Sequence, residues 1–349
     1  MTASPIVPYE KYMERCFELA ALGGKYTKTN PNVGSVIVYE DKIIGEGYHQ
    51  RFGGPHAEVN ALNSVSKADW HKIKDSTWYV SLEPCSHYGK TPPCAHAIIS
   101  SGCTKVVLGC LDPNPLVSGN GLSYLRGHGA EVVAPFCELQ AKQLISQFSK
   151  NLLNKPYVIL KWAQSEDHFL GKIGQQTWLT NPATNILTHK WRTEVDGILI
   201  GKNTAITDNP SLTSRHFHGD HPIRIVLDTH LELSEKLIIY TDAHTTWTIT
   251  QRPIFIHDKK EQIVVAEAND LSRILDLLFT RGIYSLIVEG GAKVLKSFMD
   301  QNLWDEARII KTKAVLKEGI QAPNLNGRLI KRMKIGTDEI LTIRNISKN

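Results

Sequence analysis

A histidine, a glutamate and two cysteines in the first third of the chain stand at spacings that suit metal chemistry. His56 and Glu58 lie in the stretch GGPHAEVNAL, and Cys85 and Cys94 lie in LEPCSHYGKTPPCAHAI. One imidazole and two thiolates are ligands that suit Zn²⁺. A structural zinc site usually has four protein ligands, whereas a catalytic site has three and keeps one position for water. The sequence thus predicts a zinc site with three protein ligands, His56, Cys85 and Cys94, and one open position.

Glu58 favours the catalytic interpretation of this site. In zinc deaminases with a His-x-Glu…Pro-Cys pattern, the glutamate is not a ligand but carries protons between water and the departing amine. Zinc lowers the pKa of its water, which can then attack an amidine-like ring carbon. Glu58 would take a proton from the water and pass it to a ring nitrogen and then to ammonia. The alternative is a chance group of one histidine, one glutamate and two buried cysteines, against which the proline before each cysteine argues.

The loop between the two cysteines is longer than usual. Eight residues, SHYGKTPP, separate Cys85 from Cys94, whereas Cys-x-x-Cys is the common spacing in such deaminases. A longer loop beside the zinc can present its own side chains, here His87 and Lys90, to a larger or phosphorylated substrate. His87 and His96 are possible fourth ligands but lack a Cys-x-x-Cys register, and Cys103 falls at the end of an expected helix.

A second group of residues indicates ligand binding in the other half of the chain. Gly290 and Gly291 stand between the buried strand expected in YSLIVEG and an amphipathic helix over 292–301. Glycines at such a junction let backbone N–H groups approach a phosphate at the helix N-terminus. Arg192 and Arg215 can hold a phosphate through paired N–H bonds. The alternatives are a plain tight turn for the glycines and solvated surface positions for the arginines.

Alternating strands and helices are expected to position the first group. A hairpin is expected in GSVIVYEDKIIGEGYH, and single strands in STWYVSL and TKVVLGCL. Helices are expected in YEKYMERCFELAAL, over 56–65, in PPCAHAIISSG and over roughly 137–153. Helices on both faces of a sheet would make this an α/β domain. Pro156 disfavours a helix at the residue before it, so the domain boundary is expected near 154–155.

The second half of the chain begins again with a strand, in YVILKWA. Further strands are expected in GILIG, PIRIVLD, TWTIT, PIFIH, QIVVA, YSLIVEG and EARIIKTKAVL. Helices over 182–194, 270–281 and 292–301 alternate with them. This pattern predicts a second α/β sheet rather than a continuation of the first. The expected domains are therefore residues 1–153 and 154–349.

Composition and charge describe an ordinary globular protein. The 349 residues are 42% hydrophobic and 21% charged, and the formal net charge of +5 is too mild for a nucleic-acid footprint. No apolar run approaches the roughly 18 residues of a membrane span, and the N-terminus lacks a signal-peptide pattern. Six scattered cysteines do not form a disulfide framework. We expect a cytoplasmic protein that binds neither nucleic acid nor a membrane.

Several stretches of the first half together resemble one family. TNPNVGSVIV, GYHQRFGGPHAEVNAL, EPCSHYGKTPPC and DPNP are similar to the deaminase domain of the bifunctional riboflavin-biosynthesis enzyme, diaminohydroxyphosphoribosylaminopyrimidine deaminase / 5-amino-6-(5-phosphoribosylamino)uracil reductase. The resemblance implies a cytidine-deaminase-like three-layer domain that holds one zinc ion. The residues that it implies in contact with the deaminase substrate are Asn32, His49, His87, Lys90, Asp112 and Asn114. Taken alone, Asn32 and Asn114 are also typical of turns beside proline, and Asp112 of a turn or a cap.

The second half is similar to the reductase domain of the same family. PYVILKWAQSEDH, WLT, WRTEVDGILIGKNTAITDNPSLTSR, VLD and VEGGAKV carry this likeness. It implies a dihydrofolate-reductase-like α/β fold and NADPH as the cofactor. The implied NADPH-binding residues are Ala163, Trp178, Thr204, Asp208, Asp228, Gly290, Gly291, Ala292, Lys293, Val294, Leu295, Lys296 and Ser297. The implied contacts of the phosphoribosyl substrate are Lys161, Gln176, Arg192, Leu212, Arg215 and Glu289.

Two departures from the family pattern fall in this half. SEDH stands where Ser-Leu-Asp-Gly is usual, so His168 replaces a glycine, and the segment to Trp178 is one residue short. Gln176 stands where serine is common. We therefore expect local backbone and substrate contacts to differ there, whereas ITDNPSLTSR and VEGG are intact.

The resemblance implies two consecutive reactions on phosphoribosylaminopyrimidine substrates. The first is the zinc-dependent hydrolytic deamination of 2,5-diamino-6-(5-phosphoribosylamino)pyrimidin-4(3H)-one, and the second is the NADPH-dependent reduction of the product's ribosyl group to ribityl. A homo-oligomer formed through the reductase domain is also implied. One alternative is a base or nucleoside deaminase fused to a reductase-like module of different substrate, against which the long cysteine loop argues. The other is an inactive binding protein with structural zinc, against which Glu58 argues.

Overall fold

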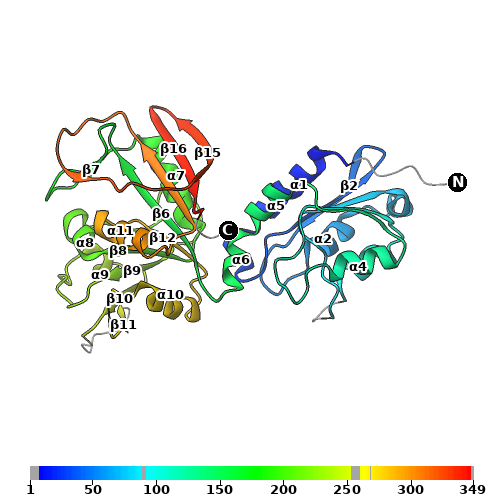
Figure 1. The fold of residues 1–349 in the computed structure, drawn as a ribbon, viewed down its shortest axis with the longest axis horizontal. Coiled ribbons are helices and arrows are strands. Elements are labelled where there is room, and N and C mark those ends of the chain that lie inside the picture. The colour runs from blue at the N-terminus through cyan, green and yellow to red at the C-terminus, as the bar shows by residue number, and fades with distance from the viewer. Residues whose placement is uncertain (1–7, 89–91, 253–259, 268, 347–349) are drawn as a thin grey trace. The chain divides into compact units, whose positions relative to one another are not determined.

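The chain folds into two compact units, Met1–Leu153 and Asn154–Asn349 (Figure 1). The computed structural model describes residues 8–88, 92–252, 260–267 and 269–346. The strand predicted in PIFIH lies outside these residues. None of the helices in the described part of the chain has both the length and the apolar character needed to cross a membrane.

The sheet of the first unit has five strands in the order β2-β1-β3-β4-β5. The strands are β1 (Gly34–Tyr39), β2 (Lys42–Tyr48), β3 (Thr77–Val80), β4 (Lys105–Leu108) and β5 (Glu131–Val133). β1 is antiparallel to β2 and β3, whereas β3, β4 and β5 are parallel. The predicted hairpin is present, and its turn residues Glu40 and Asp41 have φ of 45° and 62°. Two residues in this left-handed conformation match the twist of the strands that they join.

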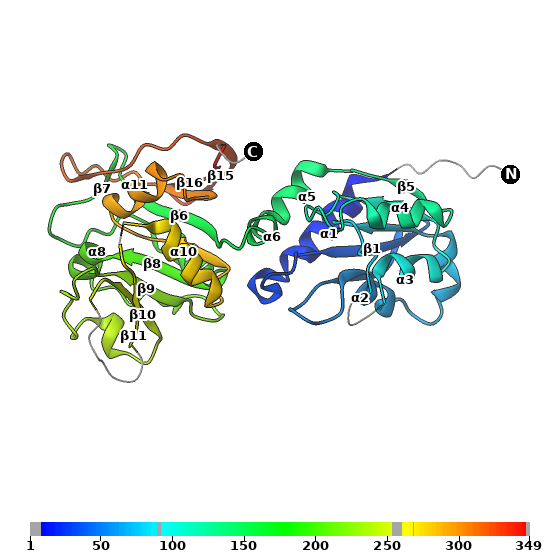
Figure 2. The same cartoon turned by 60° about the horizontal axis from the view of Figure 1, so that its bottom comes forward.

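Helices cover both faces of this sheet, as the sequence predicted (Figure 2). They are α1 (Glu10–Ala21), α2 (Ala57–Ser64), α3 (Cys94–Ser100), α4 (Asn120–Gly127), α5 (Glu138–Leu144) and α6 (Ser146–Asn151), with 3₁₀ turns η1 (Gly24–Thr27) and η2 (Trp70–Asp75). α1 contributes Met13 to a core cluster with Val36, whereas α2 and α3 contribute Ala61 and Ile98 to a cluster with Ile37. Because neighbouring side chains of a strand point to opposite faces, β1 serves both cores. The first unit therefore has three layers.

The single helix predicted over 137–153 is instead two helices, α5 and α6. Ile145 separates them, with φ of −95° and ψ of 12° outside the helical region. Its side chain is buried in a small cluster with Leu82, Cys110 and Ala141. A pattern of apolar residues predicts that this segment packs on the sheet, but it does not show that one residue leaves the helical conformation to do so.

The sheet of the second unit has nine strands in the order β11-β10-β9-β8-β12-β6-β13-β16-β15. They are β6 (Tyr157–Gln164), β8 (Gly197–Gly201), β9 (Ile223–Leu227), β10 (Thr246–Thr250), β11 (Lys260–Val264), β12 (Ser285–Val288), β13 (Glu306–Lys311), β15 (Arg328–Ile335) and β16 (Asp338–Arg344). In this order, each strand from β11 through β10, β9, β8, β12 and β6 to β13 is parallel to the next. β16 and β15 add an antiparallel hairpin at the end of the sheet, which was not predicted from the sequence. Two short strands, β7 (Phe169–Gly171) and β14 (Ile320–Gln321), pair separately.

Helices cover both faces of the second sheet as well. They are α7 (Pro182–Thr193), α8 (Lys202–Asp208), α9 (Ile238–Thr241), α10 (Leu271–Thr280) and α11 (Ala292–Asp300). α10 and α11 contribute Leu278 and Phe298 to one core cluster, and α7 contributes Trp191 to the cluster of the other face. The carboxyl ends of parallel strands lie at one edge of the sheet, where open α/β sheets bind ligands. Of the predicted reductase residues, Thr204 follows β8, Asp228 follows β9 and Glu289 follows β12 at that edge, and Ala163 lies near the carboxyl end of β6.

Candidate active sites

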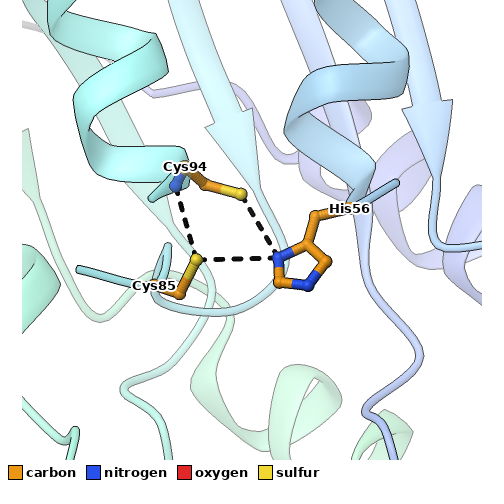
Figure 3. A group of neighbouring side chains, drawn as sticks. All are labelled: His56, Cys85 and Cys94. Carbon is orange, nitrogen blue, oxygen red and sulfur yellow. Dashed lines mark hydrogen bonds between the residues drawn. The ribbon is translucent and has the colours of Figure 1, made fainter. Parts of the chain in front are cut away.

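The three predicted zinc ligands lie together in the first unit (Figure 3). Nδ1 of His56 is 3.6 Å from Sγ of Cys85 and 3.3 Å from Sγ of Cys94, and the three donor atoms lie within 4.8 Å of one another. Ligands at zinc bond lengths of about 2.0–2.3 Å in a tetrahedron stand roughly 3.5 Å apart. The hydrogen bond from Cys94 lowers the pKa of Cys85 well below its ordinary value, against the effect of burial. The donor set and its spacing therefore fit a zinc ion.

Each zinc ligand is placed by the start of a helix or the loop beside it. His56 is the N-cap residue of α2, and Cys94 is the first residue of α3. Cys85 lies in the loop after β3, where its carbonyl accepts a hydrogen bond of 3.1 Å from the N–H of Ala95. Two helix N-termini thus face the ligands, and their partial positive charge favours thiolates.

Glu58 lies in the first turn of α2 and is only 3% exposed. Burial raises the pKa of Glu58 to about 7, while His56 opposes this shift. The carboxyl also interacts with the thiol of Cys94. The structure therefore places a buried carboxyl beside the ligand cluster, as the deaminase pattern requires.

The predicted substrate residues His49 and Asn32 lie in the loops before the ligand histidine. His49 is 3% exposed, and its ring centre is 5.5 Å from that of His56. Its Nδ1 is 3.0 Å from the carbonyl oxygen of Pro55, and its Nε2 is 3.1 Å from the side-chain amide of Asn30. Both ring nitrogens of His49 are thus engaged within the protein. Asn32 is half-buried and accepts a hydrogen bond of 3.1 Å from the hydroxyl of Thr27.

The remaining predicted substrate residues lie in the cysteine loop and in the segment after β4. His87 is exposed in the described part of the cysteine loop, and Lys90 lies outside the described residues. Asp112 is half-buried and within electrostatic reach of His87, and burial raises its pKa. Asp112 accepts a hydrogen bond of 2.8 Å from the N–H of Asn114, whose own side chain accepts one of 3.1 Å from Leu116. Asn114 therefore shapes the turn, which is the alternative that its position beside proline suggested.

A cavity of about 760 Å³ opens at the carboxyl edge of the second sheet. Of the residues predicted for the NADPH site, Ala163, Trp178, Thr204, Asp208, Gly290, Gly291, Ala292, Lys293 and Val294 line it. Of the residues predicted for the reductase substrate, Lys161, Gln176, Arg192, Leu212 and Glu289 line it. Its volume is within the range of small-molecule sites. One cavity thus brings together most of both predicted sets.

The N-terminus of α11 forms part of the cavity wall and suits a phosphate group. Gly291 is its N-cap residue and donates a hydrogen bond of 3.0 Å to the hydroxyl of Thr204. A Cβ atom at Gly290 would lie 2.8 Å from Cβ of Val294, so only glycine allows this close approach. Helix N-termini bind anions through their free N–H groups. The wall therefore fits the pyrophosphate of a dinucleotide.

Three charged side chains, each only 9–13% exposed, line the same cavity. Arg192 donates two hydrogen bonds to Glu289, of 3.1 and 2.9 Å, and Nζ of Lys161 is 3.4 Å from the same carboxylate. Burial lowers the pKa of Lys161, whereas Glu289 opposes that shift. Arg192 also donates to the carbonyl of Thr213 at 3.0 Å and thereby holds the loop after α8. The cluster carries one net positive charge, which suits a phosphorylated substrate.

Other predicted reductase residues lie away from this cavity. Asp228 is buried, and its carboxylate accepts hydrogen bonds from the N–H groups of Glu232 and Leu233. Leu295 is fully buried in the core, and Lys296 pairs with Asp300 on the outer side of α11. Ser297 lines a neighbouring cavity of about 400 Å³, which shares Leu227, Lys293 and Val294 with the first. Arg215 is exposed and donates a hydrogen bond to the hydroxyl of Ser211.

The two departures from the family pattern have local consequences. His168 adopts φ of 66°, the left-handed conformation that glycine favours, and its Nδ1 lies 2.9 Å from Nε2 of Gln164. The turn between β6 and β7 is therefore formed without a glycine. Gln176 donates a hydrogen bond of 3.2 Å to the carbonyl of Asp208, and both residues line the cavity.

Residues that the sequence analysis missed also shape both sites. In the first unit they are Asn30, which contacts His49, and Glu83, which accepts three backbone hydrogen bonds. In the second unit, Asn185, Thr188 and Asn203 add polar groups to the cavity wall. Glu83 stands directly before Pro84-Cys85, but a charge beside a motif does not reveal which distant N–H groups it will meet.

Known proteins resemble both units. Residues 7–110 match the cytidine and deoxycytidylate deaminase zinc-binding region, and residues 156–316 match the RibD C-terminal domain. The riboflavin biosynthesis protein RibD of Aquifex aeolicus is 39% identical over 330 residues, which cover 92% of this chain and 91% of that protein. RibD of Escherichia coli is 35% identical and covers 85% of each chain. The crystal structure of a diaminohydroxyphosphoribosylaminopyrimidine deaminase/5-amino-6-(5-phosphoribosylamino)uracil reductase from Thermotoga maritima matches with a TM-score of 0.86 at 32% identity, over 96% of this chain and 98% of that one.

These matches confirm the predicted fold classes, a cytidine-deaminase-like domain followed by a reductase domain of the RibD type. They also confirm the prediction of zinc for the first activity and NADPH for the second. The chain therefore belongs to the RibD family of bifunctional deaminases and reductases of riboflavin biosynthesis.

Proposed function

We propose that residues 1–153 carry the deaminase activity and residues 154–349 the reductase activity, on the substrates that the family resemblance implies. The first unit deaminates 2,5-diamino-6-(5-phosphoribosylamino)pyrimidin-4(3H)-one. The second reduces the ribosyl group of 5-amino-6-(5-phosphoribosylamino)uracil to ribityl. The observation that carries this proposal is the cluster of His56, Cys85 and Cys94 with the buried carboxyl of Glu58 beside it.

In the deaminase reaction, Glu58 moves the protons. His56, Cys85 and Cys94 would hold a zinc ion, which would make a water molecule acidic enough to attack at neutral pH. Glu58 accepts a proton from that water and delivers it to the ring nitrogen next to the attacked carbon. It would then take the proton of the added hydroxyl group, as the carbonyl forms, and pass it to the amino group, which leaves as ammonia. Because Glu58 is buried, it exchanges protons with the substrate rather than with bulk water.

The substrate of the deaminase is held by residues on three loops. We assign direct contacts to Asn32, His87, Lys90 and Asp112. His49 acts through its neighbours, because both of its ring nitrogens already have partners within the protein. Asn114 shapes the turn beside Asp112, whose carboxylate accepts its N–H. An amide, an imidazole, an ammonium and a carboxylate together match the polar edge of an aminopyrimidinone and the phosphate of its phosphoribosyl group.

In the reductase reaction, the protein positions two ligands in one cavity. NADPH would supply the hydride for C1′ of the ring-opened ribosyl imine, whose nitrogen would take the balancing proton from water. Gly290, Gly291 and Thr204 would hold the cofactor's phosphates at the N-terminus of α11. Lys161 and Arg192 hold the phosphoribosyl group, and Glu289 fixes the orientation of both cations.

We further propose a cytoplasmic homo-oligomer that forms through the second unit. β15 stands at the end of the nine-stranded sheet, and an edge strand offers backbone groups for pairing with a second chain. Leu329 on this strand is 45% exposed. The measurement that tests this assembly is the molar mass in solution of the wild type and of a Leu329→Lys variant.

A Glu58→Gln variant tests the deaminase assignment. Ammonia release should fall by about 10²–10⁴-fold, because general acid–base catalysis contributes that much. Zinc content and the reduction of 5-amino-6-(5-phosphoribosylamino)uracil should stay at wild-type levels, as in a Glu14→Gln control on the exposed side of α1. Wild-type ammonia release by Glu58→Gln would contradict the proposal. The proposal would also be contradicted if the wild-type protein deaminated cytidine but did not deaminate the phosphoribosyl substrate.

A further inference from the structure

Glu83 is a buried carboxylate that binds a segment 29 to 39 residues further along the chain. The residue is only 5% exposed, and its two oxygens accept hydrogen bonds from three backbone N–H groups. These belong to Asp112 at 3.1 Å, Gly119 at 2.9 Å and Leu122 at 3.0 Å. Hydrogen bonds to a charged group are the strong ones, and a buried donor that loses its acceptor is costly. Glu83 therefore fixes the backbone of the 112–122 segment.

The same carboxylate replaces the missing cap of α4. Gly119 is the N-cap residue of this helix and has no side chain to bind its first N–H groups. The negative charge of Glu83 satisfies two N–H groups of this helix start, and it complements the partial positive charge of the helix N-terminus. A Cβ atom at Gly121 would lie 2.0 Å from the carbonyl oxygen of Pro84. The start of α4 is thus packed directly against the backbone that precedes Cys85.

This connection joins the metal ligand to the substrate segment. Glu83 stands two residues before Cys85, and the segment that it holds begins with Asp112. Asp112 lies within electrostatic reach of both Cys85 and His87. A shift of the 112–122 segment would move Asp112 relative to the zinc ligands, and small misplacements of such groups reduce rates strongly.

We infer that Glu83 is a positioning residue of the deaminase, which holds Asp112 in place relative to Cys85 by fixing the 112–122 segment. The inference rests on the proposed function, since it requires Asp112 to contact the substrate. Glu83 acts through the backbone of this segment, because both of its oxygens are engaged there. Its loss should therefore affect deamination and leave zinc binding and reduction intact.

A Glu83→Gln variant of the full chain tests this inference. Glutamine has the same shape, but it lacks the charge and turns an N–H₂ group toward the backbone donors. Deaminase kcat/KM should fall by roughly tenfold or more, with a rise in KM, since charged hydrogen bonds are lost. Zinc content and reductase kcat/KM should equal those of the wild type and of the exposed control Glu14→Gln. Glu83→Asp, which keeps the charge but is shorter, should show a smaller loss.

A double-mutant cycle with Asp112→Asn separates positioning from a general structural role. If Glu83 acts through Asp112, Glu83→Gln should cost less than about threefold in the Asp112→Asn background, because the two effects are not additive. If the two substitutions reduce the deaminase kcat/KM of the double variant by factors that multiply, the inference is overturned. An unchanged deaminase kcat/KM in Glu83→Gln would also overturn it. Loss of zinc or of reductase activity in both Glu83 variants would overturn it too. If Asp112→Asn leaves the deaminase kcat/KM unchanged, the substrate role of Asp112 is refuted, and the inference about Glu83 is refuted with it.

Discussion

Arg192 and Glu289 form a two-point ion pair in the wall of the reductase cavity, with contacts of 3.1 and 2.9 Å. The two side chains are only 13% and 9% exposed, and Lys161 completes the cluster from β6. Parallel N–H···O bonds of this kind fix orientation as well as distance. The pair therefore fixes two charged side chains of the cavity wall relative to each other.

Removing the carboxylate of this pair should destabilise the second unit. Glu289→Gln leaves Arg192 and Lys161 as buried cations without a counter-charge, which costs about 3–5 kcal/mol. Denaturant unfolding followed by a probe in the second unit measures the change. The matched control is Glu166→Gln, which breaks an exposed pair with Lys313 and should cost less than about 1 kcal/mol. Equal costs for the two variants would contradict a buried, stabilising pair.

The same carboxylate predicts a pH dependence of stability. Although burial opposes it, the charges of Arg192 and Lys161 hold the pKa of Glu289 at about 2, below its ordinary 4.5. The stabilisation is present above pH 4.5 and is lost as the pH falls toward 2, because the unfolded chain takes up the proton first. Between those values wild type should lose about 3 kcal/mol more than Glu289→Gln. Parallel stability curves for the two proteins would refute the assigned pKa.

The zinc cluster predicts a selective loss of one activity. Cys85→Ser removes one of three ligands, so bound zinc and ammonia release should both fall to background, while reduction by the second unit continues. Metal analysis and the two separate assays measure this. Cys137→Ser is the control, since Cys137 is a half-buried cysteine outside the ligand cluster. Retention of zinc and deaminase activity in Cys85→Ser would exclude Cys85 as a ligand.

The close contact at Gly290 predicts that a larger residue there weakens NADPH binding. Gly290→Ala places a Cβ atom 2.8 Å from Cβ of Val294, so the N-terminus of α11 must shift. The KM for NADPH should rise by roughly tenfold, the effect of losing about 1.4 kcal/mol of binding energy, and ammonia release should not change. Gly127→Ala, where an added Cβ meets nothing within 4 Å, provides the control. An unchanged KM would show that this helix start does not contact the cofactor.

Residues close together in a motif were predictable from the sequence. His56 and Glu58 stand at the start of α2 and Cys94 at the start of α3, as local spacing indicated, whereas their meeting at one site followed from the deaminase pattern as a whole. The hairpin of β1 and β2 was equally local. In contrast, the contacts of Glu83 depend on how β3 and β4 bring distant segments together, and no local pattern encodes them.

The site residues that the family resemblance implied as one continuous segment were predicted with the least precision. The stretch 290–297 was assigned to NADPH as a whole, but successive residues of a helix point in different directions. Gly290 to Val294 therefore line the cavity, whereas Leu295 faces the core and Lys296 pairs with Asp300. Asp228 was assigned from the VLD motif, yet its carboxylate is occupied by the turn that follows β9. A motif identifies the segment, and only the packed structure shows which side chains face the ligand.

We expect one chain to deaminate its substrate first and to reduce the product second, and a coupled time course distinguishes this order from its reverse. The chain is supplied with 2,5-diamino-6-(5-phosphoribosylamino)pyrimidin-4(3H)-one, with and without NADPH, and ammonia and NADPH absorbance are followed together. We predict that ammonia appears at the same initial rate in both cases, and that NADPH oxidation follows after a lag with equal final yield. NADPH oxidation before or without ammonia release would contradict this order, and the absence of both signals in zinc-replete protein would contradict the assignment itself.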